Sequence, residues 1–86
     1  MEFVIFGKPN CQFCEMSKQL LTMRNKQFEY LSLDQDYVLE SMTKTVVDLT
    51  GVPPRTFPQI LSEVNGEVTY VGGFTELRDL MAQIAE

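Results

Sequence analysis

The spacing of apolar residues predicts a strand followed by a helix in the first quarter of the chain. Residues 2–7 (EFVIFG) form an apolar run of the length of a buried strand. Apolar residues then recur at three- and four-residue steps at Phe13, Met16, Leu20 and Met23. This spacing places one apolar stripe on a helix that runs from residue 11 to about residue 24.

The middle of the chain repeats the alternation of strand and helix. Residues 28–33 (FEYLSL) are aromatic and aliphatic enough for a second strand. Apolar residues at helical steps between positions 39 and 49 predict a second helix, which ends at Gly51. Asp34 or Asp36 is expected to cap the N-terminus of that helix.

A proline-rich loop and a hairpin follow. The three prolines in residues 52–58 (VPPRTFP) predict a loop, because proline removes backbone donors and restricts the residue before it. Residues 59–64 and 67–71 flank Asn65-Gly66, which is a strong signal for a two-residue turn. These two segments therefore predict an antiparallel hairpin.

A final helix completes a βαβαββα order. It is expected to begin at Phe74 or Thr75 and to end with the chain, because apolar residues between positions 77 and 84 again have helical spacing. The first βαβ unit should place two parallel strands side by side, to which the hairpin adds two antiparallel strands. The predicted fold class is α/β, with a mixed four-stranded sheet flanked by helices in one domain over residues 1–86.

Composition and charge narrow the classes of function. Apolar residues are 44% of the chain and charged residues 22%, which is ordinary for a folded domain. The net charge of −5 argues against nucleic-acid binding through a broad basic surface, since phosphate contacts need clustered Lys and Arg. We find no secretory signal and no run of about 20 apolar residues, so a cytoplasmic protein without a membrane span is expected.

Cys11 and Cys14 are the only cysteines of the chain and stand at the start of the first predicted helix. A Cys-X-X-Cys pair after the first strand of such a pattern is typical of the thioredoxin-like redox arrangement. Three other uses stay open: a structural disulfide, half of a zinc site shared between two chains, and two buried core cysteines. A reducing cytoplasm disfavours the first, and the chain has no histidine to complete a zinc site by itself, so no metal is expected.

The position of Cys11 favours a reactive thiolate. A helix N-terminus presents unpaired N–H groups and about half a positive elementary charge, and Lys8 adds a cation three residues earlier. Such surroundings lower the pKa of a cysteine thiol. Cys11 is therefore the expected nucleophile, and Cys14, one turn deeper, the expected resolving thiol. A Cys-His hydrolase is excluded, because the chain contains no histidine.

Three motifs resemble those of the glutaredoxin family, and the likeness extends over essentially the full chain. KPNCQFC (residues 8–14) resembles the family's Lys-x-x-Cys-Pro-Tyr-Cys, RTFPQI (55–60) its Arg-Thr-Val-Pro-Gln-Ile, and VGGFTEL (71–77) its Gly-Gly-x-Thr/Asp-Asp-Leu segment. The resemblance is to dithiol members with a thioredoxin fold. The departures, which point to a divergent and phage-type member, are Gln12-Phe13 for Pro-Tyr, Phe57 for Val and Glu76 for Asp.

The resemblance implies a glutathione site beside the cysteines. Pro58 matches the family's cis-proline, which would turn the backbone of Phe57 toward the cysteine of glutathione. Lys8 and Arg55 would meet the glycine carboxylate, or they are solvated loop charges. The residues implied in glutathione binding are Lys8, Phe13, Arg55, Thr56, Phe57, Pro58, Gly73, Phe74, Thr75 and Glu76. Phe13 could instead fill the core, and Gly73 could serve only a turn.

The function that the resemblance implies is that of a monomeric, dithiol, glutathione-dependent thiol-disulfide oxidoreductase. Glutathione would donate electrons, and the substrates would be protein disulfides and glutathione mixed disulfides, with ribonucleotide reductase as a candidate acceptor. One alternative is a hydrogen-donor redoxin reduced by thioredoxin reductase, although the Ser-Gly-Phe-Arg-Pro signature of such proteins is missing. Another is a module that binds an iron–sulfur cluster with glutathione as co-ligand, against which Cys14 argues.

Overall fold

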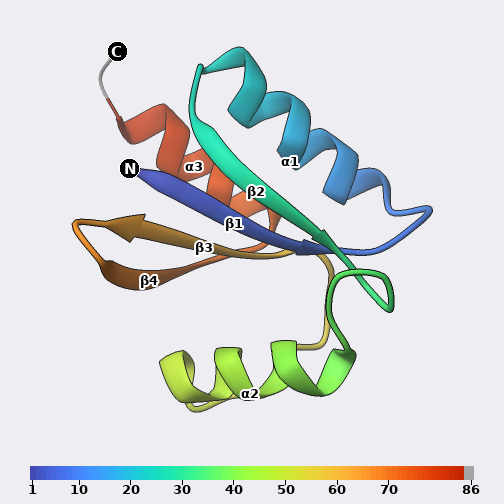
Figure 1. Cartoon of the computed structure of the whole chain (residues 1–86). Helices are drawn as coiled ribbons and strands as arrows, with labels where there is room; N and C mark the ends of the chain where they lie inside the picture. The colour runs from blue at the N-terminus through green and yellow to red at the C-terminus, as the bar shows by residue number, and fades with distance from the viewer. Residues whose placement is uncertain (85–86) are drawn as a thin grey trace.

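The predicted order of seven elements is confirmed in a computed structural model, which describes residues 1–84 (Figure 1). The elements are β1 (Glu2–Gly7), α1 (Gln12–Met23), β2 (Gln27–Ser32), α2 (Leu39–Thr50), β3 (Gln59–Val64), β4 (Glu67–Gly72) and α3 (Phe74–Gln83). The strands form one mixed sheet in the order β2-β1-β3-β4. β1 pairs with β2 in parallel and with β3 antiparallel, and β3 pairs antiparallel with β4.

The hairpin turn forms where the sequence predicts it. Asn65 and Gly66 connect β3 to β4 with backbone φ angles of 53° and 83°. A two-residue turn with positive φ at both positions matches the right-handed twist of the strands that it joins. The antiparallel register then brings the end of β4 beside the start of β3, where Gly72 pairs with Ile60.

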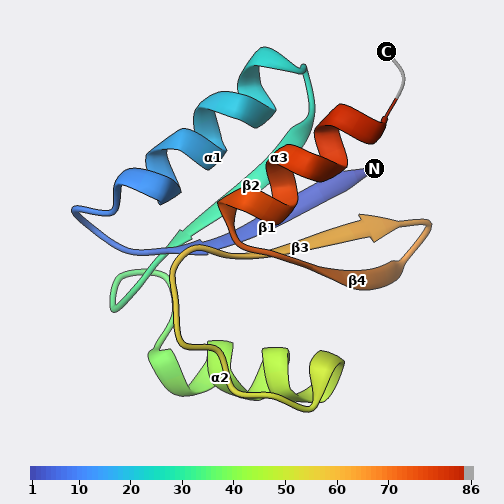
Figure 2. The ribbon, with the colours of Figure 1, turned by 180° about the vertical axis from the view of Figure 1, so that it is seen from behind.

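The helices cover both faces of the sheet. α1 and α3 lie together on one face and α2 lies on the other, as the two opposite views show (Figures 1 and 2). Side chains along β1 point alternately to the two faces, as expected for a strand. Those toward α1 and α3 join the buried cluster Phe3, Ile5, Leu21, Ile60, Leu77 and Met81. Those toward α2 contact the cluster Phe6, Met42, Val46 and Leu61.

The apolar stripe predicted for α1 is wrong by about one residue around the helix. Cys14, Ser17 and Leu21 form its buried face, whereas Phe13 is 52% exposed and Met23 78% exposed. Leu20 belongs to the predicted stripe and Leu21 to the observed one, so the leucines do not decide between them. The burial of Cys14 against the sheet selects the stripe that contains Leu21. Ser17 is tolerated there because its hydroxyl donates a hydrogen bond of 2.8 Å to the carbonyl oxygen of Phe13.

The predicted end of α2 is confirmed, but its predicted cap is wrong. Gly51 ends the helix in the left-handed conformation, with φ at 79°. The N-cap is Val38, which makes no side-chain cap. Asp36 is used elsewhere, because its carboxylate accepts a hydrogen bond of 2.8 Å from the backbone N–H of Ser32. Asp34 lies in the same turn with a positive φ of 65°, away from the helix start.

α3 begins at Phe74, one of the two predicted starts, and ends at Gln83 rather than at the end of the chain. Residues 85–86, to which the predicted helix extended, lie outside the described residues. Within residues 1–84, none of the helices has the length and apolar character needed to cross a membrane.

Candidate active site

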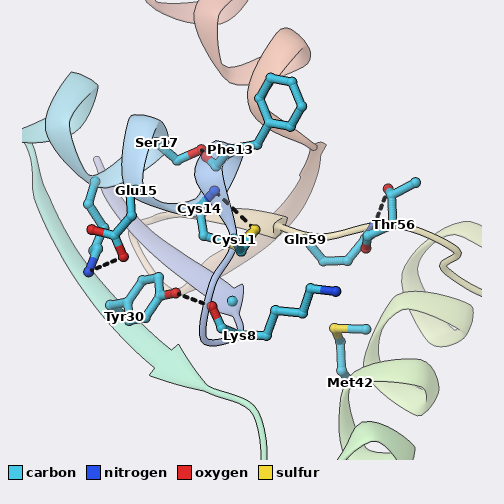
Figure 3. Close-up of a disulfide and its surroundings, with 12 residues drawn as sticks. Lys8, Cys11, Phe13, Cys14, Glu15, Ser17, Tyr30, Met42, Thr56 and Gln59 are labelled. Carbon is cyan, nitrogen blue, oxygen red and sulfur yellow. Dashed lines mark hydrogen bonds and ion pairs between the residues drawn. A yellow bond between two sulfur atoms is a disulfide. The ribbon is translucent and has the colours of Figure 1, made fainter.

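The cysteine pair sits at the start of α1, as predicted. Cys11 is the N-cap of the helix and forms a disulfide with Cys14, with 5.2 Å between their Cα atoms (Figure 3). The Sγ of Cys11 accepts a hydrogen bond of 3.2 Å from the backbone N–H of Cys14. Cys11 is 9% exposed and Cys14 is fully buried. Cys11 is therefore the less buried of the two cysteines, and a helix donor already points at its sulfur.

Sheet pairing explains why three distant segments meet at the cysteines. β1 runs into the loop that carries them, and its residue Phe6 pairs with Gln59, the first residue of β3. The loop before β3 therefore arrives beside the cysteine loop. Since Gly72 pairs with Ile60, the start of α3 arrives at the same place.

Lys8 lies on the α2 side of the cysteine loop. Its Nζ is 5.0 Å from the centroid of the Phe57 ring, which is a cation–π contact. Figure 3 shows the side chain extended toward Met42 of α2. The ammonium group is thus held against the proline-rich loop, next to the segment on which the cysteines lie.

Two tyrosines hold the backbone that leads into the cysteine loop. The hydroxyl of Tyr37 donates a hydrogen bond of 2.8 Å to the carbonyl oxygen of Gly7, and the hydroxyl of Tyr30 donates one of 3.4 Å to that of Lys8. A Cβ atom at Gly7 would overlap the ring of Tyr30, so glycine allows this close approach. Lys18 of α1 makes a cation–π contact with the same tyrosine, because its Nζ lies 4.2 Å from the centroid of the Tyr30 ring.

We expect the stability of the protein to fall as pH rises from about 10 to about 12 because of Tyr37. Burial, followed by the nearby Tyr30 and Asp34, raises the pKa of Tyr37 from 10.0 to about 12. The folded state then keeps a proton that the unfolded state has lost, so unfolding is favoured in this pH window and stability is full below pH 10. Urea unfolding across this range measures the effect.

Tyr37→Phe is the matched variant for this titration. Its loss of the hydrogen bond to Gly7 should cost about 1 kcal/mol below pH 10. Above pH 10 its stability should fall less steeply than that of the unmodified protein, although Tyr30 and Tyr70, whose pKa values are also raised by burial, still titrate. Equal slopes in the two proteins would show that Tyr37 does not carry the effect.

Hydrogen bonds between Gln59 and Thr56 hold the loop before β3 in place. The peptide bond between Phe57 and Pro58 is cis, as the resemblance implied. Buried Gln59 donates hydrogen bonds of 2.8 Å and 3.2 Å from Nε2 to the carbonyl oxygen and hydroxyl of Thr56, and its Oε1 accepts one of 2.6 Å from the hydroxyl of Tyr70. These contacts hold Thr56 and Phe57 beside the cysteine loop.

A groove of about 180 Å³, here called the aromatic groove, is lined in part by Phe13, which lies between the two cysteines in the sequence. Its lining residues are Phe13, Thr56, Phe57, Gly73, Phe74, Thr75 and Glu76. The rings of Phe13 and Phe74 stack with 6.0 Å between centroids and 27° between planes. Glu76 folds back at the end of the groove, where its Oε1 accepts a hydrogen bond of 2.8 Å from the backbone N–H of Gly73.

Comparisons with known proteins identify the family of this chain. The family model described as Glutaredoxin matches residues 3–69. The chain belongs to the glutaredoxin family. It is 34% identical over 77 residues to Glutaredoxin 1 of Salmonella typhimurium, which covers 85% of this chain and 82% of that protein. It is also 34% identical over 77 residues to mitochondrial Glutaredoxin-2 of Bos taurus, covering 90% of this chain but only 45% of the bovine protein.

The fold of the glutaredoxin is also that of solved relatives. The crystal structure of a buckwheat glutaredoxin–glutathione complex superimposes with a TM-score of 0.70 at 22% identity, covering 93% of this chain and 67% of that one. The predicted thioredoxin-like fold is therefore confirmed. Glutaredoxins are thiol-disulfide oxidoreductases, so this protein is an enzyme of that class, with Cys11 and Cys14 as its redox-active pair.

The structure brings together most, but not all, of the residues implied in glutathione binding. Seven of them line the aromatic groove. Pro58 is buried behind it, with its carbonyl oxygen 3.5 Å from where a Cβ atom of Gly73 would lie. Lys8 lies on the other flank of Phe57 and does not line the groove. Arg55 is exposed on the loop and does not line it either. Phe13 does not fill the core, because it is stacked on Phe74 at the surface.

Sequence reasoning missed the residues that support the site. Tyr30 and Tyr37 were assigned no role, although both hold the cysteine loop, and Gln59 was assigned none within RTFPQI. A buried glutamine after a cis-proline is a signal that could have been noticed. Tyr37, by contrast, sits in a turn, and only the packing of α2 directs it to Gly7. Within the described part of the chain, no three His, Cys, Asp or Glu side chains cluster so as to hold a metal ion.

Proposed function

We propose that the protein is a dithiol glutaredoxin that uses glutathione to reduce protein disulfides and glutathione mixed disulfides. The observation that carries the proposal is the aromatic groove, in which Phe13, from the segment between the two cysteines, stacks on Phe74 at the N-terminus of α3. The buckwheat relative is described in complex with glutathione, which supports the same ligand here.

Cys11 would carry out the nucleophilic step. Its thiolate attacks the glutathione sulfur of a mixed disulfide, and the substrate leaves as a thiolate that takes up a proton. A second glutathione thiolate then attacks the Cys11-bound glutathione, which releases glutathione disulfide and restores the Cys11 thiolate. With a protein disulfide, Cys14 attacks Cys11 instead, so that the substrate leaves reduced and the Cys11–Cys14 disulfide forms.

The residues around the groove would each hold one part of glutathione. The backbone of Phe57 would pair with its cysteine in the manner of an added strand. The first N–H groups of α3, at Thr75 and Glu76, would receive the γ-glutamyl carboxylate. Oε1 of Glu76 already accepts a hydrogen bond from Gly73, and its second oxygen would meet the ligand ammonium group. Lys8 and Arg55 would approach the glycine carboxylate from the flank of Phe57.

The setting that fits this proposal is the cytoplasm, where glutathione keeps thiols reduced, and the working form would be a monomer. The acceptors would be proteins that cycle through a disulfide. Ribonucleotide reductase is a candidate among them.

The decisive experiment is to identify the reductant. Glutathione with glutathione reductase and NADPH is expected to sustain reduction of hydroxyethyl disulfide, whereas thioredoxin reductase with NADPH is not. Phe13→Ala should raise the KM for the glutathione mixed disulfide about threefold to tenfold, because stacking of aromatic rings and their burial contribute on the order of 1 kcal/mol. The matched control is Met23→Ala on the exposed end of the same helix, which should leave KM unchanged. Turnover with thioredoxin reductase alone would instead make the protein a hydrogen-donor redoxin.

A further inference from the structure

A second and larger groove is lined by residues of α3 and of the β3–β4 hairpin, elements that lie next to each other in Figure 2. It has a volume of about 490 Å³ and is here called the β4 groove. Val64, Val71 and Leu80 give it an apolar lining, and Glu76 and Asp79 of α3 line it as well. The activity proposed above makes no use of most of these residues.

The β4 groove neighbours the aromatic groove. Glu76 lines both, so the two hollows lie beside each other at the start of α3. At its other end the β4 groove shares Val64 with a smaller hollow of about 280 Å³, which Glu2 and Glu63 also line. The three neighbouring hollows, here called the track, follow one another from the Phe13 and Phe74 rings along α3 to the tip of the hairpin.

The charged side chains on this track are all acidic, and Met1 at the N-terminus lines it as well. Glu76, Asp79, Glu63 and Glu2 line it, and none of the lining residues within 1–84 is a Lys or Arg. Arg78 contacts Asp79 at 3.5 Å, but its side chain is not part of the lining. Acidic side chains beside an apolar floor complement a partner that combines Lys or Arg with apolar residues.

The position of the groove suits an extended chain. β4 is the last strand of the sheet, so one of its edges is not paired within residues 1–84. Residues alternate between two sides of an extended segment, so apolar side chains can enter the floor while basic side chains between them meet the acidic residues.

We propose that this track is the docking site for an extended segment, with alternating apolar and Lys or Arg residues, that neighbours the disulfide of a protein substrate. The inference rests on the proposed reduction of protein disulfides and adds the chemistry by which substrates are chosen. The aromatic groove binds the part of the substrate that carries the disulfide, and the β4 groove binds the sequence next to it. Discrimination between disulfide proteins then resides on α3 and β4.

Synthetic peptides test the docking. Each carries one cysteine in a mixed disulfide with glutathione and an extension of six residues, the length of β4, on either side of the cysteine. One extension alternates Leu and Lys, and its partner alternates Leu and Glu. With the extension on one of the two sides of the cysteine, we expect kcat/KM to be about tenfold higher for the Leu-Lys peptide than for the Leu-Glu peptide. Each exposed charge pair contributes weakly, and several of them together give this difference.

Two charge-reversal variants distinguish docking in the groove from general electrostatic attraction to the protein. Asp79→Lys should remove most of the preference for Leu-Lys. Asp48→Lys on α2 is the matched control, because Asp48 is 63% exposed and pairs with Lys44, much as Asp79 is 61% exposed and pairs with Arg78. It should keep the preference. Equal losses in the two variants, or no loss in Asp79→Lys, would overturn the proposal in favour of simple steering by the net charge.

A binding measurement distinguishes failure of the docking site from failure of the proposed function. A cysteine-free Leu-Lys peptide should shift the backbone amide signals of Val64, Val71 and Leu80 in the disulfide-bonded protein, without any reductant. If hydroxyethyl disulfide is not reduced with glutathione but these shifts occur, the docking site stands and the proposed function fails. If glutathione turnover is normal and the shifts lie elsewhere, the docking site is wrong. Self-association through this face, seen as a dimer by sedimentation, would also overturn it.

Discussion

Cys11→Ser is expected to reduce both activities of the protein to the background of the reaction without enzyme. Cys11 is the less buried cysteine and so the one that a substrate is expected to reach, and a serine hydroxyl does not ionise near pH 7 even with the N–H of Cys14 pointing at it. The loss should appear both with a glutathionylated peptide and with a protein that contains an internal disulfide. Coupled oxidation of NADPH measures the two rates.

Cys14→Ser should separate the two activities. A second glutathione can resolve the intermediate at Cys11, so reduction of the glutathionylated peptide should keep much of its rate. Reduction of the internal disulfide should fall severely, because fully buried Cys14 is the thiol positioned to release the trapped partner. Mass spectrometry should then find a mixed disulfide at Cys11.

The reverse pattern would contradict the assignment of roles. If Cys11→Ser stays active on the glutathionylated peptide while Cys14→Ser is inert, Cys14 is the nucleophile. Iodoacetamide supplies a control that does not depend on turnover. In Cys14→Ser, the alkylation rate of Cys11 against pH should give a pKa well below the usual value of about 8.5, since the helix N-terminus favours the thiolate.

Leu77→Ala is expected to lower the free energy of unfolding by about 3 kcal/mol. Leu77 is fully buried on α3, where it packs in the cluster that also contains Phe3, Ile5 and Leu21. Truncation removes buried apolar surface and leaves a cavity, which together cost about 2–5 kcal/mol for such a change. For a small domain this is a large part of the total stability. Urea unfolding of the disulfide-bonded form measures the loss.

The matched control is Leu49→Ala on α2, whose side chain is exposed. It should cost less than about 1 kcal/mol, since little apolar surface leaves contact with the protein. Leu77→Ala should also raise the KM for glutathione substrates, because α3 carries Phe74, Thr75 and Glu76 of the aromatic groove. Equal stability of the two variants would show that α3 is not anchored through Leu77.

Local chemistry predicted the elements and their order correctly. The Asn65-Gly66 turn, the end of α2 at Gly51 and the start of α1 at Cys11 all depend on residues within one turn of each other. The same is true of the cysteine pair, because three residues of helix bring two thiols together wherever the helix lies. The single domain over residues 1–86, the monomer and the roles of individual glutathione contacts remain predictions.

Periodicity alone misjudged which face of α1 is buried. Stripes one residue apart differ little in apolar content, and the choice between Phe13 and Cys14 is made by the sheet beneath them. The cap expected from Asp34 or Asp36 failed for a similar reason. A carboxylate takes the nearest unpaired donor, and the turn after β2 presents the N–H of Ser32 first.

The sequence by itself determined the succession of strands and helices, the placing of Cys11 and Cys14 at a helix start, and the proline-rich loop, because each follows from near neighbours in the chain; the cis form of Pro58 was implied only by the family resemblance. Only the tertiary structure decided what surrounds the cysteines. Pairing of Phe6 with Gln59 joins residues 53 apart in the sequence, pairing of Ile60 with Gly72 joins residues 12 apart, and together they form the aromatic groove. The β4 groove likewise exists only once α3 packs on the sheet, since hydrophobic burial is non-directional and leaves the geometry of such contacts to the whole fold.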